Sequence, residues 1–169
     1  SVKYSGAVVL VAPLTAWLVA RAWSHTSEPA RPPVTALIIA PVAALVAFAL
    51  TSPYTFLDWQ SAWHDISFEL QHMRIGDDPW MMATYPNGWL FHLHGLALGT
   101  GLVMLAASAI GLAAGLAAGR RELLPLLVFG LVAFVLIGNA AVRYARYEMP
   151  LLPVLAVFAG DAKKVIRYQ

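Results

Sequence analysis

The sequence has no cysteine and few charged residues, and each of these absences excludes a class of protein. Without cysteine, the chain holds no disulfide, no catalytic thiolate and no cysteine-ligated zinc. Charged residues make up 12% of the chain and hydrophobic residues 60%, whereas a soluble domain carries roughly a quarter charged residues. A formal net charge of +2 gives no broad basic surface for nucleic acid. The composition therefore indicates a membrane protein with no nucleic-acid partner.

Long apolar runs replace the missing charges. A membrane-spanning helix needs about 20 mostly apolar residues, and the runs predict an all-α, polytopic transmembrane bundle with spans at about 4–23, 34–50, 89–119, 123–142 and 147–162. The fifth run is short, and its prolines fit a helix start better than a helix middle. Gly111, Gly115 and Gly119 recur every four residues in the third run, which predicts close packing of helices.

The basic residues predict the orientation of this bundle. Because the chain begins with Ser1 and no signal cleavage site precedes the first run, we expect 1–169 to be a single transmembrane domain excerpted from a longer protein. Alternating spans divide the basic residues into Arg21, Arg31, Arg120, Arg121, Lys163, Lys164 and Arg167 on one side and Lys3, Arg74, Arg143 and Arg146 on the other. The positive-inside rule makes the more basic side cytoplasmic.

The segment 51–88 then forms an extracytoplasmic loop. Within it, about 56–74 has helical periodicity, with tryptophans on one face and acidic residues on another. This pattern predicts an amphipathic helix lying at the outer membrane surface.

Several polar side chains on this outer side are candidates for lining a cavity: Asp58, Asp65, Glu69, His72, His92 and His94. Carboxylates and an imidazole at i, i+4 and i+7 can share a zinc or manganese ion, but Asp65, Glu69 and His72 match no known metal motif. We favour a hydrated polar face, and the residues leave open whether a divalent metal is used.

The stretch "RYARY" carries a second candidate site. Arg143 and Arg146 are three residues apart, so on a helix they point the same way. Guanidinium groups grip phosphate with paired hydrogen bonds, and Tyr144 and Lys3 can add donors. The pattern fits a lipid-anchored phosphate as well as it fits interfacial anchoring in which Glu148 neutralises an arginine.

Four stretches together resemble a known family: "SVKYSGAVVLVAPL", "TSPYTFLDWQSAWHDISFELQH", "GWLFHLHGLALGTG" and "RYARYEMPLLPVLAVFAG". Their order and spacing resemble the C-terminal part of bacterial membrane glycosyltransferase family 39. That family is similar to the protein O-mannosyltransferases and to the aminoarabinose transferases of lipid A, within the GT-C superfamily.

The resemblance implies an enzyme of the bacterial inner membrane and cell envelope that works on the extracytoplasmic side. Such an enzyme passes a sugar from a polyprenyl-phosphate carrier to an acceptor. Arg143 and Arg146 would stabilise the leaving phosphate, with Lys3 and Tyr144 assisting. The family's catalytic acid lies in an early outer loop that has no counterpart here, so we expect no catalytic residue in this chain, which alone would be inactive. A lipid-phosphate transporter or flippase segment and a non-catalytic structural subunit are the alternatives.

Overall fold

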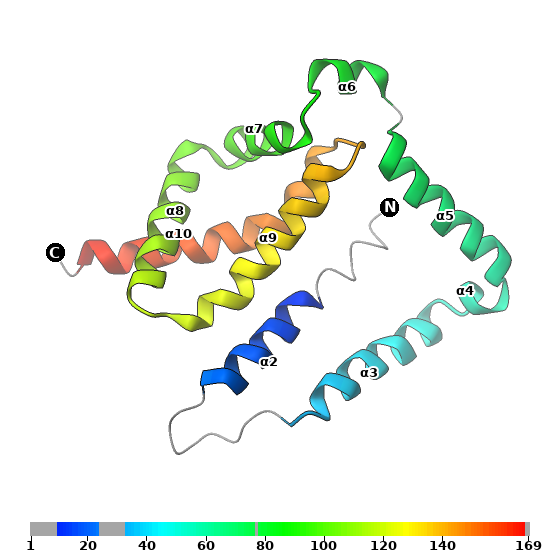
Figure 1. The fold of residues 1–169 in the computed structure, drawn as a ribbon, viewed down its shortest axis with the longest axis horizontal. Coiled ribbons are helices and arrows are strands. Elements are labelled where there is room, and N and C mark those ends of the chain that lie inside the picture. Colours follow the sequence, from blue (N-terminus) through cyan, green and yellow to red (C-terminus); the bar gives the residue numbers. More distant parts are fainter. Residues whose placement is uncertain (1–9, 24–32, 77, 168–169) are drawn as a thin grey trace.

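The computed structural model describes residues 10–23, 33–76 and 78–167, and this part of the chain is all helical, with no β-strand (Figure 1). Lys3 and Arg31 lie outside the described residues. The longer helices are α2 (Val11–Trp23), α3 (Ala36–Thr51), α5 (Trp59–Ile75), α7 (Gly88–Thr100), α8 (Leu102–Ala117), α9 (Leu124–Asn139) and α10 (Leu152–Arg167). The short elements are α4 (Tyr54–Leu57), α6 (Pro79–Thr84) and the 3₁₀ helices η1 (Arg121–Leu123) and η2 (Ala145–Leu151).

Helices α7 to α10 form the core. Leu151, in the turn before α10, is buried, and Val154 and Phe158 are buried on α10 at helical spacing. Leu151 packs with Leu96 and Ala133 in one cluster, and Val154 and Phe158 pack with Leu123 in another. This stripe of apolar side chains attaches α10 to α7, α9 and η1.

Small residues let α8 approach α10 closely, as the glycine spacing predicts. A Cβ on Gly111 would overlap the carbonyl oxygen of Phe158 and lie 2.7 Å from the Ala162 nitrogen. One turn earlier, the Ser108 hydroxyl donates to the Leu155 carbonyl oxygen over 2.8 Å. The Leu123 side chain occupies the space that a side chain at Gly115 would need. Gly119 has open space around it, and its φ of 69° turns the chain after α8. The packing role is therefore confirmed for Gly111 and Gly115.

The third apolar run, 89–119, is not the single helix that its length predicts. It breaks at Gly101, and α7 and α8 meet at 105°. Gly101 has φ 80° and ψ 150°, which only glycine adopts readily. The Thr100 hydroxyl and the Gly101 amide donate to the carbonyls of Leu96 and Ala97 and close the last turn of α7.

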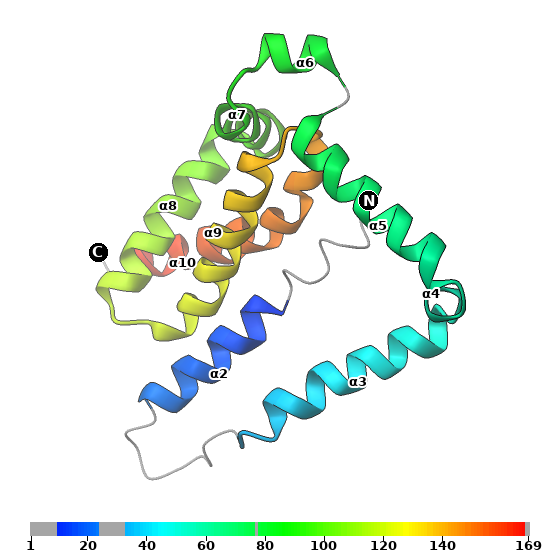
Figure 2. The same cartoon turned by 45° about the vertical axis from the view of Figure 1, so that its right-hand side comes forward.

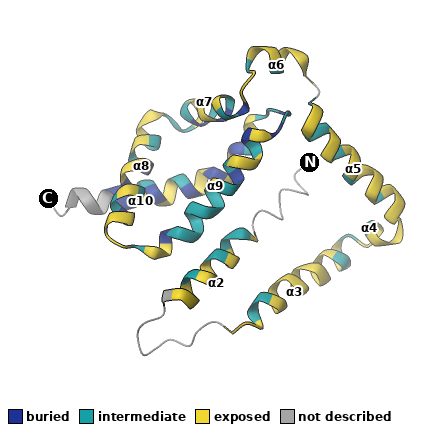
Figure 3. Ribbon diagram, viewed as in Figure 1, coloured by how far each residue is buried: buried dark blue, intermediate teal, exposed yellow. Residues whose placement is uncertain are grey.

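Helices α3 and α5 lie beside the core rather than within it (Figures 1 and 2). Neither has a buried residue, and both are mostly exposed in Figure 3. The predicted helix at 56–74 is confirmed, with a break at Asp58 between α4 and α5. The far end of α5 joins the core, because the Ala141 amide donates to the Met73 carbonyl over 2.8 Å.

Within the described ranges, Arg121–Asn139 is the one helical stretch long and apolar enough to cross a bilayer. The bent pair α7 and α8 would be a second if it counts as one span. Val11–Ala22 and Ala36–Thr51 are apolar but shorter.

Candidate functional site

A cleft of about 350 Å³ lies where the start of α7 meets the end of α9. Its walls come from two segments that are far apart in sequence: the turn into α7, and the last residues of α9 with the irregular stretch that follows them. The lining residues are Pro86, Asn87, Gly88, Trp89, Gly138, Asn139, Ala140, Ala141 and Arg143. The cleft therefore combines one cation with two side-chain amides and exposed backbone.

Glycine and an amide cap hold these walls together. The Asn87 side-chain oxygen Oδ1 accepts from the backbone amides of Trp89 and Leu90, at 2.9 and 3.3 Å, and so caps the start of α7. A Cβ on Gly138 would lie 2.7 Å from the Trp89 ring. A Cβ on Gly88 would lie 2.5 Å from the Gly138 carbonyl oxygen, so α7 and α9 approach closely because both positions are glycine. Larger residues at these positions would separate the two walls.

Arg143 is the cation of the cleft. Its guanidinium donates to the carbonyl oxygens of Tyr85 and Pro86, the latter over 3.1 Å. Its Nε is buried and has no hydrogen-bond partner within the described part of the chain. Arg143 thus bridges the end of α9 to the turn before α7 with two of the five N–H groups of its guanidinium.

Arg146 is placed differently from Arg143, and the expectation that the two point the same way on one helix is wrong. Arg143 precedes η2, and Tyr144 between them is extended, with φ −125° and ψ 131°. Arg146 is exposed, and its guanidinium carbon lies 4.4 Å from the ring centre of Tyr144 and 5.6 Å from that of Tyr147. The two rings meet edge to face at 5.7 Å. Cation–π contacts occupy the faces of a guanidinium and leave its edge donors available for an anion.

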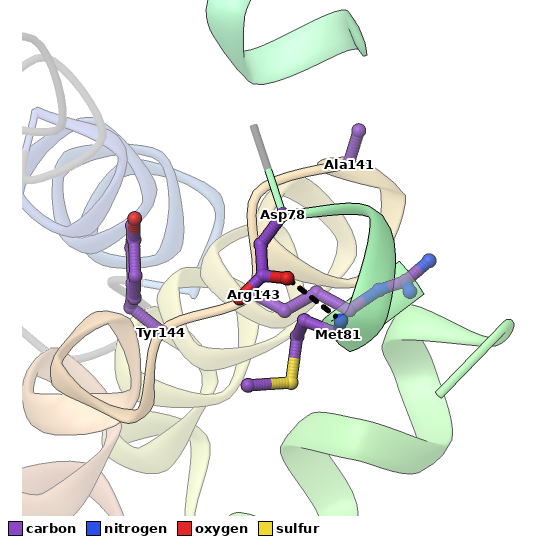
Figure 4. A pocket seen from close by; sticks show the side chains of 5 residues that line it. All are labelled: Asp78, Met81, Ala141, Arg143 and Tyr144. Atoms are coloured by element: carbon purple, nitrogen blue, oxygen red, sulfur yellow. Dashed lines mark hydrogen bonds between the residues drawn. The ribbon is translucent and has the colours of Figure 1, made fainter. Parts of the chain in front are cut away.

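A second, smaller cavity of about 20 Å³ lies on the other side of Arg143 (Figure 4). Asp78, Met81, Ala141, Arg143 and Tyr144 line it. The Asp78 carboxylate caps α6 by accepting from the Met81 amide over 3.0 Å. In Figure 4 the side chains of Arg143 and Tyr144 extend in different directions. A space of this size holds about one water.

Beneath the cleft, His92 and Glu148 form a buried pair that the sequence did not reveal. The His92 Nδ1 and Glu148 Oε1 atoms are 3.0 Å apart, and the side chains are 0% and 7% exposed. Gly95, one turn after His92, makes room for the carboxyl, which occupies the space a Cβ would need. The expectation that Glu148 neutralises an arginine is therefore wrong. The sequence feature that pointed to this pair is the single acidic residue before the last apolar run, Glu148, together with His92 and Gly95, which are three residues apart in an earlier apolar run.

Burial is the main influence on this carboxyl. Glu148 lies in η2, between the apolar helices α9 and α10. The hydrogen bond with His92 compensates part of the hydration that the carboxyl loses there. The His92 Nε2 atom is buried without a hydrogen-bond partner in the described ranges.

The other residues predicted to line a cavity are not in the walls of these two, and that role stays a prediction. Asp58, Asp65 and His94 are exposed, and Glu69 and His72 are half-buried on α5. Asp58 instead caps α5, accepting from the Ser61 amide over 3.2 Å. Within the described residues, no three His, Asp or Glu side chains are grouped to hold a metal ion.

An ion pair joins the turn after α8 to α10, at the end of α9 away from the cleft. The Arg120 guanidinium lies 2.6 Å from Asp161, whose side chain is 10% exposed, and 2.7 Å from Glu122. Hydrogen bonds with Asp161 first, and then with Glu122, raise the pKa of Arg120. This pair fixes the far end of the bundle.

Comparison with known proteins gives no relative. No protein-family model, curated protein or solved structure matches the chain.

Proposed function

We propose that the chain is the carrier-binding part of a membrane glycosyltransferase of the family 39 type. In this proposal it binds a sugar donor linked to polyprenyl phosphate and the parent protein passes the sugar to an extracytoplasmic acceptor. The observation that carries the proposal is the cleft with Arg143 in its wall and Arg146 close by along the chain. Both cations stand at the same end of the apolar bundle, where a phosphate anchored by a lipid tail would lie.

The proposal treats the bundle as polytopic and embedded in the bacterial plasma membrane. Large apolar side chains on the outside of the core support it, among them Val103, which is 85% exposed, and Leu98, which is 75% exposed. Lipid tails would cover such side chains, whereas water would oppose their exposure. In this arrangement α7 and α8 form one bent span, and α5 with its stacked Trp59 and Trp63 rings lies at the outer interface.

The positions of the charged residues at the two ends of the core support this orientation. Arg120 pairs with Asp161 at one end of the core, and Arg143 and Arg146 lie at the other. Helix α9, which separates them, has 16 residues and so is about 24 Å long at about 1.5 Å per residue. The cytoplasmic side would hold Arg120, and the cleft would open outward.

The chemistry needs cations where the leaving phosphate gains charge. When a sugar leaves a polyprenyl phosphate, negative charge develops on the phosphate oxygens, and positioned guanidinium donors stabilise it. Arg146 offers its edge donors, and Arg143 offers the terminal N–H groups that its two backbone carbonyls do not use. The described residues supply no catalytic base in this proposal. The base that deprotonates the acceptor would come from the rest of the parent chain, as the resemblance implies.

The test is sugar transfer by the parent protein in vesicles that contain the lipid-linked donor. Arg143→Ala and Arg146→Ala should each abolish transfer, with unchanged expression. Arg21→Ala is the matched control and should retain transfer, because Arg21 is an exposed arginine in the last turn of α2 and does not line the cleft. Full turnover in both cleft variants would refute the proposal.

A lipid-phosphate transporter is the second candidate, because ionisable residues are buried in the bundle. His92, Glu148 and Asp161 are each less than a tenth exposed, and transporters place such residues along the substrate path. Movement of polyprenyl phosphate across a sealed vesicle without sugar transfer would favour this function over the first.

A further inference from the structure

The buried pair of His92 and Glu148 connects the two elements that carry the site. His92 belongs to α7, whose first residues, Gly88 and Trp89, line the cleft. Glu148 belongs to η2, which also carries Arg146 and Tyr147. This contact of 3.0 Å therefore links the cleft wall to the arginine segment, beside the apolar packing of Leu96 on Leu151.

The stability of the fold does not by itself explain why a polar pair is buried here. A buried carboxyl and imidazole lose their hydration, and apolar side chains of similar size often serve a protein's stability as well or better. A hydrogen bond differs from apolar packing in having a direction and a fixed length. Gly95 strengthens that constraint, because the carboxyl fits into the space left by its missing side chain. The pair therefore sets the position of η2 on α7 more tightly than apolar packing would.

That position decides where Arg146 lies. Glu148 follows Arg146 by two residues on the same 3₁₀ helix. The centres of the Tyr144 and Tyr147 rings lie within 5.6 Å of the Arg146 guanidinium carbon. Moving η2 would move both rings and the cation together. A displacement of about 1 Å is enough to weaken a charged contact that depends on geometry.

We propose that Glu148 and His92 are positioning residues that hold η2 on α7 so that Arg146 can bind the phosphate of a polyprenyl-phosphate lipid beside the cleft. This inference rests on the function proposed above. It assigns the buried pair a role in binding without direct contact with the ligand.

The test is a double-mutant cycle on binding by the parent protein in nanodiscs. The probe is polyprenyl phosphate, and polyprenol of the same length measures binding without the phosphate. Glu148→Ala should weaken binding of the phosphate lipid about tenfold, and it should have little further effect in an Arg146→Ala background, because coupled residues are not additive. Glu148→Gln, which keeps the shape and a hydrogen bond to His92, should restore most of the affinity.

A control at the other end of the bundle separates positioning from general loss of structure. Asp161→Asn weakens the ion pair with Arg120, which lies away from the cleft. Any effect it has on binding should be the same with and without Arg146→Ala. Equal effects of Glu148→Ala in both backgrounds would overturn the inference. If the unmodified protein binds polyprenyl phosphate no better than polyprenol, the proposed function itself fails. If Glu148→Ala does not fold, His92→Gln takes its place in the cycle, with the same two readings.

Discussion

The Arg143 guanidinium donates a hydrogen bond to the carbonyl oxygen of Tyr85, 58 positions away in sequence, and another to that of Pro86. These two bonds close the turn that leads into α7. Arg146 has no such backbone contact among the interactions described; its guanidinium lies over Tyr144 and Tyr147 instead. The two arginines therefore differ in what they hold, although the sequence presents them as a pair.

This difference predicts unequal effects of lysine at the two positions. Lysine keeps the charge but lacks the planar fork, so Arg143→Lys should bridge the two carbonyls less well. We expect Arg143→Lys to lower the unfolding midpoint in detergent and to weaken binding of polyprenyl phosphate. Arg146→Lys should weaken binding with no change in the midpoint. Equal changes in both quantities for both variants would contradict the assignment.

Gly111 is predicted to tolerate no side chain. Its missing Cβ lets the Phe158 backbone contact α8, and an inserted methyl group in a packed interface costs about 1–3 kcal/mol. Gly111→Ala should lower the free energy of unfolding by about that amount, measured by denaturant titration in mixed micelles. Gly99→Ala is the matched control, since open space surrounds Gly99 within α7. It should be neutral or stabilise the helix by up to about 1 kcal/mol.

Gly101 is limited by its backbone instead of by space. Nothing lies within 4 Å of an added Cβ, but its φ is 80°. A side chain there costs about 1–3 kcal/mol in strain. Gly101→Ala should therefore destabilise the protein or straighten the 105° bend between α7 and α8. The distance between spin labels at the exposed positions Leu93 and Leu116 reports the angle. An unchanged distance together with an unchanged stability would show that the bend does not depend on glycine.

How much of this could be predicted from sequence differs from one element to the next. Long apolar runs predicted the helices, and the glycine spacing predicted close packing at Gly111 and Gly115 without identifying α10 as the partner, because both are local patterns. The break at Gly101 was missed, although "GTG" was its signal, because apolar residues continue on both sides. The site was predicted in part. Arg143 lies in the cleft, but its carbonyl partners and the pairing of His92 with Glu148 span more than fifty residues, and no local pattern specifies such contacts.

Asp58 is predicted to matter for α5 through its cap and not through a cavity. Loss of an N-cap carboxylate costs about 1 kcal/mol of helix stability, so Asp58→Ala should speed amide exchange in the first turn of α5, around Ser61. Asp65→Ala is the control, because that side chain is 80% exposed and its nearest partner, His64, is 3.7 Å away. It should leave exchange unchanged. A loss of sugar transfer in Asp65→Ala, with the helix intact, would support the cavity-lining role predicted for Asp65.

Asp161 and Glu122 provide the sharpest comparison, because both contact the same arginine from different environments. Asp161 is nearly buried against α8 and holds α10, whereas Glu122 is 62% exposed on the turn. Removing one partner of a buried ion pair leaves the other charge without compensation, while exposed pairs contribute little. Asp161→Asn should therefore lower the unfolding midpoint clearly, and Glu122→Gln should leave it almost unchanged. In 1 M salt the effect of Asp161→Asn should persist, since burial limits screening. Equal effects of the two variants would show that the pair is only a surface contact and that apolar packing alone holds α10 in place.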